Sequence, residues 1–331
     1  MNDRNLLMAY LAGVMDGDGS FSLARIKNGS RNYLYFPMLQ CASWRLEFIH
    51  LLKETFGGNL VTGKVHIKKN GEEGHALTCW KLRSGKNCLN PLKELIPYLK
   101  IKQLRAMVLS AFIERSPFAR GRILNEAILQ SRENDYYFMT TRNQAKHAWT
   151  HIESVKIECT YQEAWSYIAG IWDTDGSFSI KKQCINRGTD VKNPRYLPVI
   201  SLGMMDTRAI NFIRSVFEPF GESKLYIPKN KSMTNKYHFQ FGIYTKDNCI
   251  KFLKHIIPYL RSKKENALTL LEFCEKSKNT GYCKAGIPEE ELKFREECYQ
   301  KLCHLNKYGV YKPSLIDLEA RRGDKAEAKA P

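Results

Sequence analysis

Two pairs of aspartates in this chain have the residue type and spacing for divalent-metal chemistry. Asp16 and Asp18 are separated by one residue, and Asp173 and Asp175 repeat that spacing. Each pair ends an apolar helical pattern, so the carboxylates stand at a helix C-terminus, where the negative end of the helix dipole disfavours them. If the two helices pack side by side, repulsion between their acidic ends adds to this cost. A bound cation would remove both penalties, and carboxylate oxygens suit magnesium; the alternative is that each Asp-Gly step is only a helix stop.

The aspartates belong to two copies of one ten-residue pattern, Leu11–Ser20 and Ile168–Ser177. Each copy continues into an alternating Ser-Phe-Ser run, which predicts a strand. In each preceding helix, two small residues lie four positions apart and therefore share one helix face. The two helices are predicted to approach each other closely along these faces. The small residues are Ala9 with Gly13 and Ser166 with Gly170.

On these two motifs the chain resembles the LAGLIDADG homing endonucleases in their two-motif, single-chain form, over about residues 5–275. The resemblance implies a site-specific double-strand DNA endonuclease that hydrolyses a long asymmetric target and leaves short 3′ overhangs. It implies magnesium as the cofactor, about two or three ions, with manganese able to substitute. It makes Asp18 and Asp175 the catalytic metal ligands, and the backbone carbonyls of Gly17 and Thr174 add coordination.

Each copy also contains a lysine that the resemblance places near an active centre. Lys102 and Lys263 both follow an Ile-Pro-Tyr-Leu sequence, and the resemblance implies that they position or activate the attacking water. The alternative is a basic residue at a helix start that contacts phosphate or solvent. Gln40 is a candidate auxiliary residue of the site, but the corresponding position in the second copy falls near Met204.

Other landmarks recur together with the motifs and predict two copies of one unit. Phe56-Gly57 returns as Phe220-Gly221, and Ile96–Leu99 returns as Ile257–Leu260. The helical and alternating patterns predict an α+β fold of two pseudo-symmetric αββαββα units, joined through the motif helices. Each unit would be an antiparallel, saddle-shaped sheet with helices on one face. The predicted segments are a first unit at 1–115, a linker at 116–160, a second unit at 161–276, a C-terminal helical extension at 277–319 and a disordered tail at 320–331.

The uncovered face of each sheet is predicted to be polar and to lie along the major groove of DNA. In the first unit, Arg25 and Lys27 share the phase of the core residues Phe21 and Leu23, so they reach the open face only if a bulge follows Leu23. For each residue taken alone, the alternative is a solvated side chain. The predicted DNA contacts are Ser22, Arg25, Lys27, Gln40, Lys64, His66, Lys68, Lys81 and Arg83 in the first unit, and Ser179, Lys181, Gln183, Lys224, Tyr226, His238 and Gln240 in the second.

Composition favours a nucleic-acid partner. The 331 residues include 52 Lys and Arg against 34 Asp and Glu, which gives a net charge of +18,. No apolar run approaches the ~18 residues of a membrane span, and the N-terminus lacks the pattern of a secretory signal. The cysteines show no zinc-site spacing, which is typical of thiols in a reducing compartment, whether bacterial cytoplasm, chloroplast or mitochondrion. We therefore expect a monomer that binds double-stranded DNA.

Two other functions are compatible with the same basic chain. An RNA-binding maturase would assist splicing of its host intron, with or without cleavage activity, and would not require the motif aspartates. A non-cleaving DNA-binding regulator would have no need for carboxylates at unfavourable helix ends. The presence of both motif acids favours the endonuclease.

Overall fold

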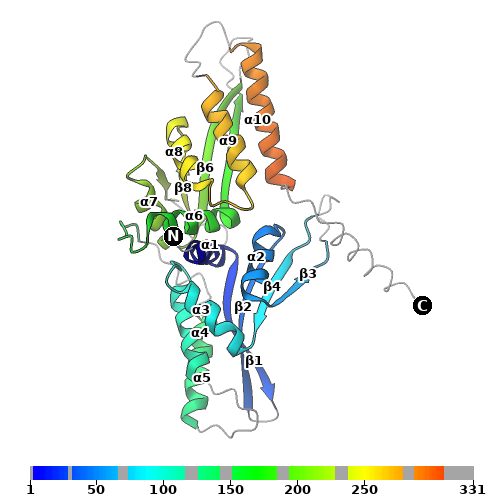
Figure 1. The fold of residues 1–331 in the computed structure, drawn as a ribbon, viewed down its shortest axis with the longest axis vertical. Helices are drawn as coiled ribbons and strands as arrows, with labels where there is room; N and C mark the ends of the chain where they lie inside the picture. Colours follow the sequence, from blue (N-terminus) through cyan, green and yellow to red (C-terminus); the bar gives the residue numbers. More distant parts are fainter. Residues whose placement is uncertain are drawn as a thin grey trace, which may run out of the picture.

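The chain folds into two successive units of helices and antiparallel strands (Figure 1). The computed structural model describes residues 3–28, 32–65, 74–115, 126–141, 151–184, 194–227, 238–278 and 287–308. The first unit contains α1 (Asp3–Gly17), β1 (Gly19–Asn28), β2 (Asn32–Ser43), α2 (Glu47–Phe56), β3 (Asn59–Thr62), β4 (Thr78–Arg83), α3 (Gly85–Leu95), α4 (Gln103–Arg115) and α5 (Glu126–Thr141). The second contains α6 (Tyr161–Asp175), β5 (Gly176–Cys184), β6 (Pro194–Met204), α7 (Thr207–Phe217), β7 (Lys224–Tyr226), β8 (Phe239–Ile243), α8 (Lys246–Ile256), α9 (Lys264–Lys276) and α10 (Glu289–Tyr308).

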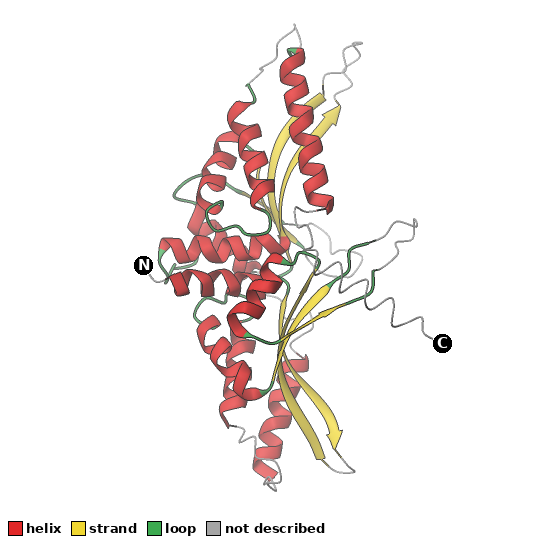
Figure 2. Ribbon diagram, turned by 45° about the vertical axis from the view of Figure 1, so that its right-hand side comes forward, coloured by secondary structure: helices red, strands yellow, loops and turns green. Residues whose placement is uncertain are grey.

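Each unit has one four-stranded antiparallel sheet, and the two sheets share one topology. The strand orders are β1-β2-β4-β3 and β5-β6-β8-β7. The helices lie on one side of the molecule and the two curved sheets on the other (Figure 2). The predicted α+β architecture of two matching units is confirmed. Among the described helices, none combines the length and apolar composition that a membrane crossing requires.

Helices α1 and α6 pack against each other at the centre of the molecule and join the two units (Figure 1). Their backbones meet at the two motif glycines. A Cβ atom on Gly13 would lie 2.1 Å from the carbonyl oxygen of Tyr167, and one on Gly170 would lie 2.0 Å from that of Tyr10. A side chain at either position would force the helices apart, so the close approach predicted from small residues is confirmed.

The covered face of each sheet supplies the hydrophobic core. In the first unit, Phe21, Leu39 and Leu82 are buried. The register pairs Phe21 with Leu39 and Leu39 with Leu82, so the three side chains share one face of the sheet,. The side chains on the opposite face are therefore the ones left to meet a partner.

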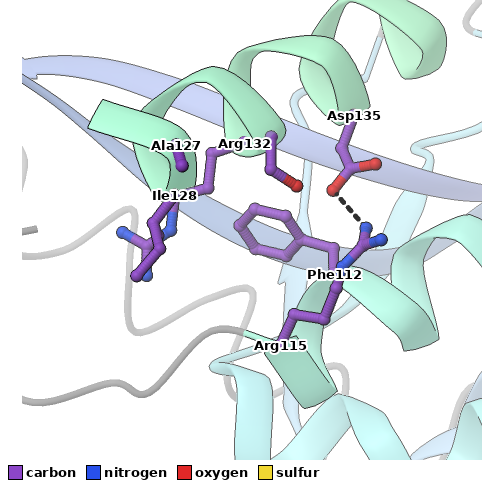
Figure 3. Close-up of a pocket in the computed structure, with 7 residues that line it drawn as sticks. Phe112, Arg115, Ala127, Ile128, Arg132 and Asp135 are labelled. Carbon is purple, nitrogen blue, oxygen red and sulfur yellow. Dashed lines mark hydrogen bonds and ion pairs between the residues drawn. The ribbon is translucent and has the colours of Figure 1, made fainter. Parts of the chain in front are cut away.

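Helix α5 lies in the segment predicted as a linker, and it packs on β1 and α4 of the first unit. Its Glu133 accepts hydrogen bonds from the guanidinium of Arg25 on β1 and from the hydroxyl of Tyr35 on β2. An ion pair of 2.7 Å between Arg115 and Asp135 ties α4 to α5 beside a small pocket (Figure 3). Helix α5 thus holds the covered face of the β1–β2 ribbon.

Helix α10 packs on β5 and α9 of the second unit in the same manner. Its Glu296 accepts a hydrogen bond of 2.7 Å from Lys182 on β5 and another from the hydroxyl of Tyr196 on β6. The pattern Arg-Glu-x-x-Tyr occurs in both helices, at Arg132–Tyr136 and at Arg295–Tyr299. The matching contacts and sequence indicate that α5 and α10 are corresponding parts of the repeat.

Candidate active site

Asp18 and Asp175 lie where the C-terminal ends of α1 and α6 meet. Asp175 is the last residue of α6, and Asp18 directly follows the last residue of α1. A Cβ atom on Gly17 would lie 2.0 Å from Oγ1 of Thr174 and 3.1 Å from Oδ2 of Asp175, so the two motif ends are in contact. The structure therefore brings the four predicted metal-site residues to one place between the two sheets.

The two carboxylates disfavour each other's charge. They reach solvent, yet the surrounding protein removes part of their hydration. This partial burial, together with the charge of Asp175, raises the pKa of Asp18 from 3.8 to about 6. Partial burial also raises the pKa of Asp175, against the opposing effect of Lys263 and Lys102. A cation bound between the carboxylates would relieve this repulsion, so the electrostatics favour a metal here.

The first aspartate of each motif has a different role from the second. Asp16 is buried and accepts hydrogen bonds of 2.7 to 3.0 Å from the backbone N–H groups of Lys100, Ile101 and Lys102, which directly precede α4. It also accepts a bond of 2.9 Å from the hydroxyl of Tyr167. The positive end of a second helix thus compensates this carboxylate, and no metal is required for it.

Asp173 repeats this arrangement in the second unit. It accepts hydrogen bonds of 2.8 to 3.1 Å from the backbone N–H groups of Arg261, Ser262 and Lys263 and one of 2.7 Å from the hydroxyl of Tyr10. The cation that we expected to compensate all four aspartates is therefore needed only for Asp18 and Asp175. The two tyrosines were not predicted, although both stand at the same place in their motif copies.

Lys102 and Lys263 bind the ends of the motif helices. The Lys102 ammonium donates to the carbonyl oxygens of Met15, Gly17 and Gly19 at 2.7 to 2.8 Å. Each lysine thereby uses all three of its donors on backbone carbonyls at the junction between a motif helix and the strand that follows it,. The acceptors of Lys263, at 2.7 to 2.9 Å, are the carbonyl oxygens of Trp172, Thr174 and Gly176.

Burial lowers the pKa of both lysines. It lowers that of Lys263 to about 8, with a further contribution from the nearby charge of Arg45. For Lys102, burial is opposed above all by the charge of Asp16, and also by those of Asp175 and Asp18. The two lysines therefore make matching hydrogen bonds, but the charge of Arg45 acts on the pKa of Lys263 alone.

The donor set fits a hard divalent cation such as magnesium. Asp18 and Asp175 supply carboxylate oxygens, and the carbonyls of Gly17 and Thr174 lie at the same helix ends. Each of these carbonyls accepts a hydrogen bond from a lysine, which leaves a second lone pair for a metal,. Within the described ranges there is no group of three or more His, Cys, Asp or Glu side chains that could hold a metal. Magnesium accepts such a small protein contribution, because it retains several waters.

The open face of the first sheet carries some of the predicted DNA contacts. The register pairs Gln40 with Lys81, and Ser22 and Arg83 both pair with Met38, so these residues share the face away from the core. Lys64 is exposed and follows the end of β3. His66 and Lys68 lie outside the described residues.

Arg25 and Lys27 are corrections to the sequence prediction. The β1–β2 register runs without a bulge from Gly19 opposite Cys41 to Asn28 opposite Asn32. Both basic residues therefore keep the phase of the core, on the face that the helices cover. There, Arg25 pairs with Glu133, and its guanidinium lies 4.3 Å from the ring centroid of Tyr33 and 4.4 Å from that of Tyr136.

The second sheet places its predicted contacts on one open face. The register connects β5 to β6, β6 to β8 and β8 to β7 without a change of phase. The side chain of His238 lies over Gly203, since a Cβ atom added there would be 2.3 Å from the His238 Nε2 atom. His238 is also close enough to Asp175 for a positive charge on it to lower the pKa of that carboxyl. The residues with the outward phase are Ser179, Lys181, Gln183, Lys224, Tyr226, His238 and Gln240.

Two matching units, with open sheets and paired acidic helix ends between them, define the fold of the single-chain LAGLIDADG homing endonucleases. The chain is similar to the solved structure of I-GzeII in complex with its DNA target, with a TM-score of 0.62 and 15% identity over 88% of this chain and 97% of that one. It is similar to I-SmaMI bound to uncleaved DNA in the presence of calcium ions, with a TM-score of 0.65 and 16% identity over 91% of this chain and 99% of that one. It is also similar to I-CpaMI bound to uncleaved DNA, with a TM-score of 0.57 and 14% identity over 92% of this chain and 99% of that one.

The sequence matches no protein-family model and no curated protein. The likeness to solved structures is therefore one of fold, and at that level the resemblance inferred from the two motifs is confirmed.

Proposed function

We propose that the chain is a site-specific endonuclease that hydrolyses double-stranded DNA with a divalent metal. The observation that carries this proposal is the meeting of Asp18 and Asp175 at two helix ends between two open sheets. A net charge of +18 suits a polyanionic substrate,. The fold neighbours in complex with DNA support the same conclusion.

Asp18 and Asp175 would hold the metal, with the carbonyls of Gly17 and Thr174. Bound magnesium supplies an activated water and stabilises the charge that develops on the leaving oxygen. We assign Lys102 and Lys263 as positioning residues, because every donor of their ammonium groups already binds a backbone carbonyl at a motif helix–strand junction. They keep the acidic helix ends in place.

The finer features of the activity rest on the family resemblance. The two sheet faces differ in sequence, so the target would be long and asymmetric, about two helical turns. Cleavage across the minor groove would leave short 3′ overhangs. We expect the protein to act as a monomer in a reducing compartment that contains DNA, and to be encoded within an interrupted host gene.

The test is cleavage of DNA fragments that carry candidate insertion junctions, in magnesium and in chelator. Asp18→Asn and Asp175→Asn should each lower the cleavage rate by at least about 100-fold, because each removes a direct metal ligand, while gel-shift binding persists. The matched control is Asp3→Asn, the same chemical change in the exposed first turn of α1. Cleavage by Asp18→Asn at the wild-type rate would refute the mechanism. A splicing assay on the host intron RNA would identify a maturase, whose activity should survive both substitutions.

A further inference from the structure

The outer half of the β1–β2 ribbon has an unusual open face. Between Ser22 and the terminal Asn28–Asn32 pair, the residues with the outward phase are Ala24 and Ile26 on β1 and Leu34 and Phe36 on β2. Ile26, Leu34 and Phe36 are 57%, 44% and 41% exposed. The register pairs Ala24 with Phe36 and Ile26 with Leu34, so the four side chains form one continuous patch, called here the apolar ribbon face.

This patch belongs to the same sheet face as the residues near the acid pair. Moving inward along the ribbon, Ser22 pairs with Met38 and Ser20 pairs with Gln40. The ribbon extends from α1 and α6 toward one end of the molecule, so the apolar ribbon face lies far from the cleavage centre (Figure 1). On the reverse side, the ribbon is held by Glu133 of α5. The apolar ribbon face is therefore exposed on the open side of the ribbon, while α5 covers the opposite side.

The second unit is different at the corresponding positions. Counted outward from the motif, Lys181 and Gln183 of β5 take the places of Ala24 and Ile26, and Arg195 of β6 takes the place of Leu34, while Leu197 in the place of Phe36 is the one apolar residue of these four. One outer ribbon can therefore donate hydrogen bonds to base edges and phosphates, whereas positions 24, 26, 34 and 36 of the other offer no side-chain donor.

We propose that the apolar ribbon face reads the 5-methyl groups of thymines in the outer part of the half-site bound by the first unit. The inference rests on the proposed function. In the major groove, the thymine methyl is the apolar feature of the base edges, and apolar side chains contact it. Placed against other base edges, the same patch would bury donors or acceptors without partners, which is costly. The target would thus be A·T-rich at one outer end and read by polar contacts at the other.

The experiment replaces thymine by deoxyuridine, which removes only the methyl group. A cleavable target is first selected from a random duplex library with the wild-type full chain. Deoxyuridine is then placed in the outer part of either end, and binding is measured in calcium. We expect about a fourfold loss of affinity for each contacted methyl at one end, and no loss at the other.

The double variant with Ile26→Gln and Leu34→Gln identifies the end that the first unit binds. It should bind deoxyuridine and thymine targets equally at that end, and selection with it should no longer enrich thymine there. The matched control is Leu197→Gln, on the open face of β6 in the second unit. It should leave the deoxyuridine effect unchanged.

Equal binding of both targets at both ends, with cleavage intact, would overturn the thymine inference and leave the endonuclease in place. Failure to select any cleavable target would overturn both. Sedimentation that showed a dimer of the free wild-type chain, and a monomer of the double variant, would assign the patch to self-association and overturn the inference.

Discussion

Replacing Asp173 by Asn should destabilise the protein strongly, whereas the same change at Asp18 should not. Asp173 has no exposed surface and accepts four hydrogen bonds. Its Oδ2 binds the N–H groups of Arg261 and Ser262 and the hydroxyl of Tyr10, and its Oδ1 binds the N–H of Lys263. An asparagine has a single acceptor oxygen, so its NH₂ group must face at least one of these donors.

The expected cost follows from these contacts. One buried N–H of the Lys263 loop would lose its acceptor, which costs about 1–3 kcal/mol. Loss of the charge beside the N-terminal end of α9 adds about 1 kcal/mol. We therefore expect Asp173→Asn to lower the free energy of unfolding by about 3 kcal/mol. Asp18→Asn instead removes the repulsion from Asp175 and should raise stability by about 1 kcal/mol or less, since both carboxylates reach solvent,.

The assay is urea unfolding of wild type, Asp173→Asn and Asp18→Asn in chelator at pH 7.5, followed by tryptophan fluorescence. Asp16→Asn is the equivalent change in the first unit, and it should lower the free energy of unfolding by a similar amount to Asp173→Asn. If Asp173→Asn cost less than about 1 kcal/mol, or if Asp18→Asn were equally destabilising, the division of the motif acids into a structural and a metal-binding residue would be wrong.

Gly170→Ala should lower the melting temperature, at a cost of about 1–3 kcal/mol or more, because its Cβ would lie 2.0 Å from the Tyr10 carbonyl oxygen. At magnesium concentrations too low to saturate the site, cleavage should decline as pH falls through about 6, because a proton on Asp18 competes with the metal; a rate that is constant down to pH 5 under these conditions would contradict this. In chelator, the raised pKa of Asp18 should make wild type lose stability relative to Asp18→Asn as pH rises from about 4 to about 6. The pKa of Glu296 is lowered to about 2, first by its hydrogen bond from Lys182. The stability that Glu296 contributes should thus be present above pH 4.5 and disappear as pH falls toward 2, which a pH series against Glu296→Gln would measure.

The sequence was sufficient to predict the repeated unit and the helix interface. Glycine at 13 and 170 and the doubled Asp-x-Asp-Gly pattern are local signals, because close backbone approach and a helix end each demand particular residue types,. The αββαββα order followed from hydrophobic periodicity, which depends only on neighbouring residues. The helices α5 and α10 were harder to place, since the Arg-Glu-x-x-Tyr pattern that relates them is short.

Which aspartate is free and which is bound was decided only by the tertiary structure. Asp16 and Asp18 are the same residue type at the same helix end, and only the family resemblance of the motif, not the local physical pattern, singled out Asp18. The distinction comes from the N–H groups of residues 100–102, which are distant in the chain and arrive only when α4 packs against α1. The direction of Arg25 likewise needed the tertiary structure, because its sequence phase matched the core, and the bulge-free β1–β2 register with the ion pair to Glu133 of α5 shows that it stays on the covered face.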